Sequence, residues 1–181
     1  MIRILIILLC IGSFAYTKEF RNENLLQTLP KDFKLAYKNE NKQTRMDMYE
    51  FISKNETLKN WSQMITTNIF HKNLNISAYE YVKSIKVKWE ENCEVGHTKL
   101  LPHGKENGYE YALVMLYCKK SKQIDKEQLT YIKAIKGNDS FYVVQKTFTY
   151  LIENDKIINT MRYLKGIGVC DTRLKNCNIS K

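Results

Sequence analysis

Apolar and polar residues alternate along most of this chain, and in two segments the apolar residues instead recur every three or four positions. Alternation is typical of strands with one buried face, whereas the longer spacing is typical of amphipathic helices. The alternating segments, bounded by turn-forming residues, therefore predict strands. These predicted strands cover residues 33–38, 45–52, 64–70, 94–101, 109–118, 128–136 and 141–150.

Two helices are predicted, one after the third strand and one after the seventh. The first begins at Ser77, because Ser77 and Glu80 have the spacing of a capping box. The second covers residues 155–165 and ends at Gly166, since glycine commonly terminates helices. Each helix has one apolar face, formed by Ala78, Tyr81, Val82, Ile85 and Trp89 in the first and by Ile157, Ile158, Met161 and Leu164 in the second.

Short polar connections join the predicted strands, so strands that are neighbours in sequence are expected to pair as hairpins. The connections are residues 39–42, 103–108 and 137–140. Residues 141–144 are apolar at every position, which predicts a central strand covered on both faces. The sequence thus predicts an α+β fold, an antiparallel sheet of about five to seven strands with two main helices packed on it.

The first fifteen residues have the features of an export signal that is removed by cleavage. Arg3 supplies a positive charge, residues 4–11 form an apolar stretch, and residues 13–15 form the small-residue end at which signal peptidase cuts. An uncut membrane anchor needs about 20 apolar residues, and this stretch ends at the polar residues 16–19.

Lipidation of Cys10 is a second alternative to cleavage, but bulky leucines stand before this cysteine where a lipoprotein signal has small residues. We therefore expect a signal peptide at residues 1–15 and a single α+β domain at residues 16–181. The mature chain is expected in the periplasm or outside the cell, with no transmembrane segment after cleavage.

The chain is basic, with 29 Lys and Arg residues against 19 Asp and Glu. Removal of the leader takes away Arg3 alone, so the mature chain would carry a net charge of +9. Such a charge suits contact with an anionic surface. The lysines are scattered, and Lys119 and Lys120 are the only adjacent pair, which argues against a nucleic-acid partner.

Four cysteines remain after removal of the leader, an even number in a chain that is predicted to be exported. Disulfides are the usual state of such cysteines, and four of them can pair in three ways. A hairpin symmetric about residues 105–106 would place Cys93 opposite Cys118. Cys170 would then pair with Cys177. No Cys-x-x-Cys motif or histidine at ligand spacing supports a redox or zinc site, so the two disulfides are predicted to be structural.

Two sequence blocks carry a resemblance to known proteins. Residues 133–145 (Lys-Ala-Ile-Lys-Gly-Asn-Asp-Ser-Phe-Tyr-Val-Val-Gln) and 169–173 (Val-Cys-Asp-Thr-Arg) resemble a family of small, exported, uncharacterised proteobacterial proteins. Residues 29–35 and 60–66 are similar to the front half of that family, so the resemblance spans most of the mature chain, but it implies no activity. The order of elements also resembles the α+β sandwich of PsbP/Mog1/DcrB-type proteins, a scaffold that mostly serves binding or assembly.

The residues that follow Cys170 suggest a binding surface beside the predicted loop to Cys177. Asp171 and Arg173 lie there, and an arginine can present a bidentate fork to a carboxylate or phosphate. The leading hypothesis is an exported, non-enzymatic binding or envelope-associated module, with an unknown protein, an envelope component or an anionic surface as partner.

The competing hypothesis is a small hydrolase or ligand-binding enzyme whose site is assembled from scattered residues. His97, His103 and Glu106 lie close together in sequence and are its candidates. Nucleophilic catalysis needs a nucleophile beside an oriented base, and no sequence landmark supports one. We therefore assign no catalytic residue, metal or cofactor from the sequence.

Overall fold

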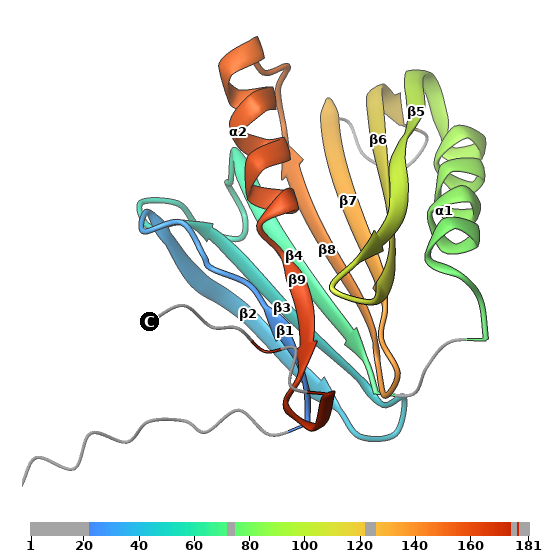
Figure 1. The fold of residues 1–181 in the computed structure, drawn as a ribbon. Helices are drawn as coiled ribbons and strands as arrows, with labels where there is room; N and C mark the ends of the chain where they lie inside the picture. The colour runs from blue at the N-terminus through green and yellow to red at the C-terminus, as the bar shows by residue number, and fades with distance from the viewer. Residues whose placement is uncertain (1–21, 72–74, 122–125, 175–176, 178–181) are drawn as a thin grey trace, which may run out of the picture.

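A curved, seven-stranded antiparallel sheet is the centre of the fold (Figure 1). The computed structural model describes residues 22–71, 75–121, 126–174 and 177, so the predicted signal peptide lies outside the described residues. In spatial order the sheet contains β2 (Phe33–Asn41), β3 (Met46–Ser53), β4 (Gln63–Phe70), β8 (Phe141–Phe148), β7 (Gln128–Lys136), β6 (Tyr109–Ser121) and β5 (Cys93–Glu106).

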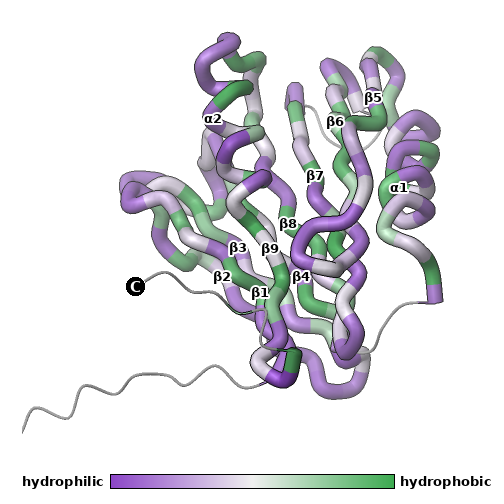
Figure 2. Tube along the Cα trace, in the orientation of Figure 1, coloured by the Kyte–Doolittle hydropathy of each residue, from purple (hydrophilic) through white to green (hydrophobic). Residues whose placement is uncertain are grey.

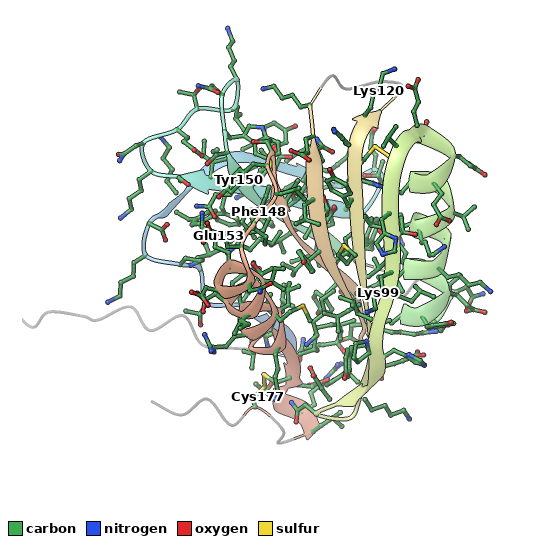
Figure 3. The ribbon with its side chains drawn as sticks, turned by 90° about the horizontal axis from the view of Figure 1, so that it is seen from above. Lys99, Lys120, Phe148, Tyr150, Glu153 and Cys177 are labelled. Atoms are coloured by element: carbon green, nitrogen blue, oxygen red, sulfur yellow. A yellow bond between two sulfur atoms is a disulfide. The ribbon has the colours of Figure 1, made fainter. Side chains whose placement is uncertain are left out.

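Two helices lie on opposite faces of this sheet. Helix α1 (Ala78–Asn92) packs on β5, β6 and β7, and α2 (Asn154–Lys165) lies over the other face, around which the sheet bends (Figure 3). This arrangement confirms the predicted α+β class, with two helices packed on an antiparallel sheet. Within the described ranges, neither helix is long and apolar enough to span a membrane.

The central strands of the sheet are buried on both faces, because their residues alternate between two apolar clusters. Tyr142 and Val144 of β8 face α2, whereas Phe141 and Val143 face α1. All four side chains are at most 4% exposed. The prediction of a central strand covered on both sides is therefore confirmed, and hydrophilic residues gather at the turns and the outer sides of the helices (Figure 2).

Local signals in the sequence determine where α1 begins. Ser77 Oγ accepts a hydrogen bond from the Glu80 amide at 3.0 Å, and the Glu80 carboxylate accepts one from the Ser77 amide at 2.8 Å. This is the predicted capping box. Helix α2 ends at Gly166 as predicted, although Gly166 has a φ of −73°, a right-handed conformation open to any residue.

The β5–β6 hairpin is longer than predicted. Instead of a loop over residues 103–108, a two-residue turn of Asn107 and Gly108 joins the strands, with φ values of +52° and +86°. Positive φ at both central residues defines a type I′ turn, which Asn-Gly favours. The predicted loop over residues 103–108 is wrong, because Asn107 and Gly108 alone make the turn and the polar residues 103–106 pair with β6.

Both predicted disulfides are present, although the register that suggested one of them is different. In the observed register Gly96, not Cys93, lies opposite Cys118. The pairing of β5 and β6 is irregular near Cys93, and Cys93 still lies close enough to Cys118 to form the disulfide. The Cα atoms are 5.7 Å apart in Cys93–Cys118 and 4.8 Å apart in Cys170–Cys177. The first disulfide joins the end of α1 to β6, and the second closes a loop after β9.

The boundaries of other elements also differ from the predicted ones, and the structure contains two strands that the sequence did not predict. The β2–β3 turn lies at residues 42–45 because Asn41 Oδ1 accepts hydrogen bonds from the amides of Gln43 and Thr44. A separate two-stranded sheet pairs β1 (Glu23–Leu26) with β9 (Gly168–Asp171), followed by a short helix, η1 (Thr172–Leu174). Each of these strands has four residues, too short for a clear alternating pattern.

Stability is expected to fall above about pH 10, because burial raises the pKa of Tyr163 to about 12. Tyrosine titrates near 10 in the unfolded chain, so the unfolded state loses this proton first as pH rises. The contribution of Tyr163 is therefore complete below about pH 10 and disappears toward pH 12, up to about 3 kcal/mol. Chemical unfolding at several pH values should show that the unfolding free energy of Tyr163→Phe falls less steeply above pH 10 than that of the unchanged protein. Equal alkaline slopes in Tyr163→Phe and in the unchanged protein would refute the assignment.

Candidate functional site

A groove of about 420 Å³ lies between α2 and the β5–β6 hairpin. Its walls come from elements that are far apart in the sequence and are brought together by the bend of the sheet around α2. The lining residues are Pro102 and Glu106 of β5, Tyr111 and Leu113 of β6, Lys133 of β7, and Met161, Arg162 and Lys165 of α2.

The groove has an apolar floor and a basic rim. Tyr111, Leu113 and Met161 belong to the apolar cluster between the sheet and α2. Arg162 and Lys165 are exposed and stand three residues apart, on the same side of α2. The Arg162 guanidinium donates a hydrogen bond to Asn159 Oδ1 at 2.5 Å. A ligand in this groove would meet apolar surface below and positive charge at the edge.

A buried lysine forms the inner wall of the groove and holds α2 over the sheet. The Lys133 side chain is 0% exposed, and its ammonium is 2.5 Å from Glu106 Oε2. It also donates to the carbonyl oxygens of Leu164 and Ile167, at 3.1 and 2.7 Å. These carbonyls lie at and just after the end of α2, where a cation is favoured by the helix dipole. Burial lowers the pKa of Lys133, and the Glu106 carboxylate opposes that shift.

The structure brings Asp171 and Arg173, the binding residues suggested by the sequence, into direct contact. The Arg173 guanidinium donates to both carboxylate oxygens of Asp171, with Nε at 2.9 and 3.0 Å. Its Nη2 also donates to Asp139 Oδ2 at 2.5 Å. Arginine lowers the pKa of the Asp171 carboxyl by hydrogen bonding. The fork of Arg173 therefore holds two carboxylates of this chain itself.

Glu23 is part of the same region and was not predicted. Its carboxylate accepts hydrogen bonds from the backbone amides of Asn138, Asp139 and Ser140, and from the Tyr142 hydroxyl. The β7–β8 turn is thus held by a residue more than a hundred positions away in sequence. No local pattern marks Glu23, because a single acid in a polar segment has many possible partners.

The histidines proposed for the competing enzyme hypothesis do not meet. Directly paired residues of antiparallel strands lie on the same face of a sheet. His97 pairs with Tyr117, which packs on the α2 side, whereas His103 pairs with Ala112, which faces α1. The His103 ring instead contacts Tyr79, with centroids 4.6 Å apart. The Glu106 carboxylate is engaged by Lys133, as described above.

One other histidine has a carboxylate within hydrogen-bonding distance. His71 Nε2 is 2.7 Å from Asp47 Oδ2, at an open surface near the β2–β3 turn. Glu40 lies close to this pair and is bound instead by Lys38 and Tyr49. Among the residues with described positions, no group of three or more His, Cys, Asp or Glu side chains could hold a metal ion.

Comparisons with known proteins show a loose similarity of fold. No protein-family model matches the chain, and no curated protein matches it. The chain is similar to the solution structure of cyanobacterial PsbP (CyanoP) from Synechocystis sp. PCC 6803, with a TM-score of 0.46 and 10% identity over 88% of this chain and 99% of that one.

A second similar structure is LpqN, described as involved in cell envelope biogenesis of Mycobacterium tuberculosis. The TM-score is 0.40, with 9% identity over 85% of this chain and 86% of that one. Both similarities concern the fold alone and agree loosely with the PsbP-like arrangement that the order of elements suggested. The resemblance to a family of exported proteobacterial proteins stays a prediction.

Proposed function

We propose that this chain is an exported, non-enzymatic binding module that holds an anionic ligand with an apolar part in the groove beside α2. The observation that carries the proposal is the combination of an apolar floor with the exposed cations of Arg162 and Lys165. A groove of about 420 Å³ has the size of small-ligand sites, which are mostly apolar with a few polar groups that orient the ligand.

The charge of the groove favours an anion over a neutral ligand. Among the described residues that line it, three side chains are cationic and one, Glu106, is acidic. Glu106 is paired with the buried Lys133. Arg162 and Lys165 at the rim are then the charges that an incoming anion meets. The net positive charge of the mature chain would also attract anionic ligands and surfaces over longer distances.

The two disulfides support the proposed location outside the cytoplasm. Structural disulfides form and persist in oxidising compartments, and the four cysteines of the mature chain form two of them. The apolar leader at residues 1–15 agrees with export. Fractionation of cells expressing the full chain should recover a protein that begins at residue 16, with its four thiols oxidised. Recovery from the cytoplasm with Met1 retained and the thiols reduced would contradict export.

Charge reversal at the groove rim should weaken the binding of an anionic amphiphile. Anilinonaphthalene sulfonate is a suitable probe because it combines a sulfonate with aromatic rings and its fluorescence rises in apolar surroundings. The double change Arg162→Glu and Lys165→Glu should raise its dissociation constant about tenfold or more, which corresponds to about 1.4 kcal/mol.

A matched control separates the groove from general charge effects. Lys59 and Lys83 are exposed lysines outside the groove, so Lys59→Glu with Lys83→Glu changes the net charge equally. This control should bind the probe as the unchanged protein does. Equal weakening in both double variants, or no weakening in either, would contradict the proposed site.

A further inference from the structure

The β7–β8 turn has the donors of a carboxylate-binding site, separate from the groove. Three successive backbone amides converge on one carboxylate: that of Asn138 is 2.5 Å from Glu23 Oε2, and those of Asp139 and Ser140 are 3.2 and 3.1 Å from Oε1. The Tyr142 hydroxyl donates to Oε1 at 3.1 Å. Successive amides in a turn form concave sites for anions, and such sites also capture carboxylates of peptides.

The site is built into the fold and not formed by Glu23 alone. Tyr142 is 4% exposed, and its side chain is held in the apolar cluster between the sheet and α2. Gly137 leaves room for the ligand, because a Cβ there would lie 2.1 Å from Glu23 Oε1 and 2.7 Å from the Ser140 carbonyl oxygen. A larger residue at position 137 would occupy the space that the carboxylate fills.

Arg173 reduces the repulsion between the neighbouring acids and an anion in this site, because it binds both of their carboxylates. Asp139 supplies one of the backbone donors, and its own carboxylate is turned to Arg173 Nη2 at 2.5 Å. Asp171, which is 1% exposed, is held by the same guanidinium. Arg173 thus acts as a positioning residue that turns both carboxylates away from the site and offsets one of their two negative charges.

The present occupant belongs to a strand that is itself anchored, because the Asn22 amide donates to Thr172 Oγ1, the Thr172 amide donates to the Asn22 carbonyl, and Leu25 packs on the apolar core. Glu23 is the first residue of β1, which has four residues and pairs with β9 alone. We propose that the β7–β8 turn with Tyr142 is a carboxylate-binding site, and that Glu23 is a built-in occupant that competes with the carboxylate of a partner. Displacement of β1 from β9 opens the site.

Chemical rescue of a Glu23→Ala variant tests this proposal with acetate as the probe. Thermal unfolding of the full chain should show a lower Tm for the variant than for the unchanged protein. Acetate should then raise the Tm of the variant saturably, by about 2 to 4 °C, because it binds the folded state alone. Acetamide, and chloride at equal ionic strength, should not do so. The unchanged protein should not respond to acetate, because Glu23 fills the site.

Two further variants keep the proposal open to refutation. Tyr142→Phe in the Glu23→Ala background removes the hydroxyl donor of the site and should weaken the response to acetate. Glu23→Gln preserves the shape of the side chain and removes its charge, so the amides of residues 138–140 should exchange hydrogen at least several-fold faster. Equal effects of acetate and chloride on the alanine variant, or unchanged exchange in the glutamine variant, would overturn the proposal. If the alanine variant folds poorly, its refolding yield in acetate against chloride replaces the Tm.

Discussion

Replacing Lys133 with methionine is expected to lower the free energy of unfolding by about 3 to 5 kcal/mol. Most of this is the cost of leaving two buried carbonyl oxygens without a donor, at about 1 to 3 kcal/mol each, because the Glu106 side chain is 35% exposed and its carboxylate can be solvated. Methionine fills a similar volume but donates no hydrogen bond. The Glu106 carboxylate then loses its counter-charge, and the carbonyls of Leu164 and Ile167 lose their donor. Urea unfolding at neutral pH would measure the loss.

Lys146 provides a matched control on the same face of the sheet. Its ammonium lies over the rings of Phe33, Phe148 and Tyr163, with 5.7, 5.6 and 5.3 Å to the centroids. Burial lowers the pKa of Lys146, and the charge of Asp32 opposes that shift. An apolar methionine keeps the contacts with these rings. Lys146→Met should therefore cost less than about 1 kcal/mol. Equal losses of unfolding free energy in the two variants would contradict the stabilising role assigned to the hydrogen bonds of Lys133.

Lys133→Met should also affect the groove, because Lys133 fixes the end of α2 that carries Lys165. Helix α2 is expected to lose its fixed distance from the β5–β6 hairpin when the bonds at Leu164 and Ile167 are lost. Binding of the anionic probe should then weaken in the Lys133 variant and persist in the Lys146 variant. This result would connect the stability of the α2 end to the function proposed for the groove.

Removal of the Cys93–Cys118 disulfide has the second-largest expected effect. The change of both cysteines to serine should lower the free energy of unfolding by about 3.5 kcal/mol, because the disulfide closes a loop with a sequence separation of 25 residues. The shorter Cys170–Cys177 loop, with a separation of 7, should cost about 2.4 kcal/mol when removed in the same way. Denaturant unfolding under oxidising conditions would give both values.

Reduction of the unchanged protein supplies the control for the serine variants. Without disulfides it should approach the stability of a variant that lacks all four cysteines. A larger loss for the shorter loop than for the longer one would contradict the chain-entropy argument for this protein. It would indicate that the C-terminal loop stabilises β9 through its folded contacts instead.

The periodicity of the sequence was sufficient to predict the strands and helices, because each of them buries one face and so carries its own pattern of apolar residues. All seven strands of the main sheet and both helices were expected near their observed positions. Strand β7 was predicted with its observed bounds, and the capping box of α1 was recognised since both of its hydrogen bonds join residues three apart. These features depend on residues that are close in sequence.

Turn geometry and strand register were less predictable. Asn107 and Gly108 carry the information for a tight turn, but the polar residues before them are also compatible with a loop. Bulges near Cys93 and between Leu100 and His103 shift the pairing of β5 and β6. Register depends on the packing of both faces of the sheet, and a single strand does not show how its partner is displaced.

The sequence by itself determined the α+β class and most element positions, because hydrophobic burial and local hydrogen bonding follow from residues near one another. The observed cysteine pairs were favoured on a hairpin register that the structure does not have. The tertiary structure alone decided which hydrogen-bonding partners the charged side chains have across long distances in the sequence. Glu23 reaches the β7–β8 turn, Arg173 binds Asp139 as well as Asp171, and Lys133 caps the end of α2. Each charged side chain had many possible partners along the chain, and only the folded arrangement brings the actual partners within hydrogen-bonding distance.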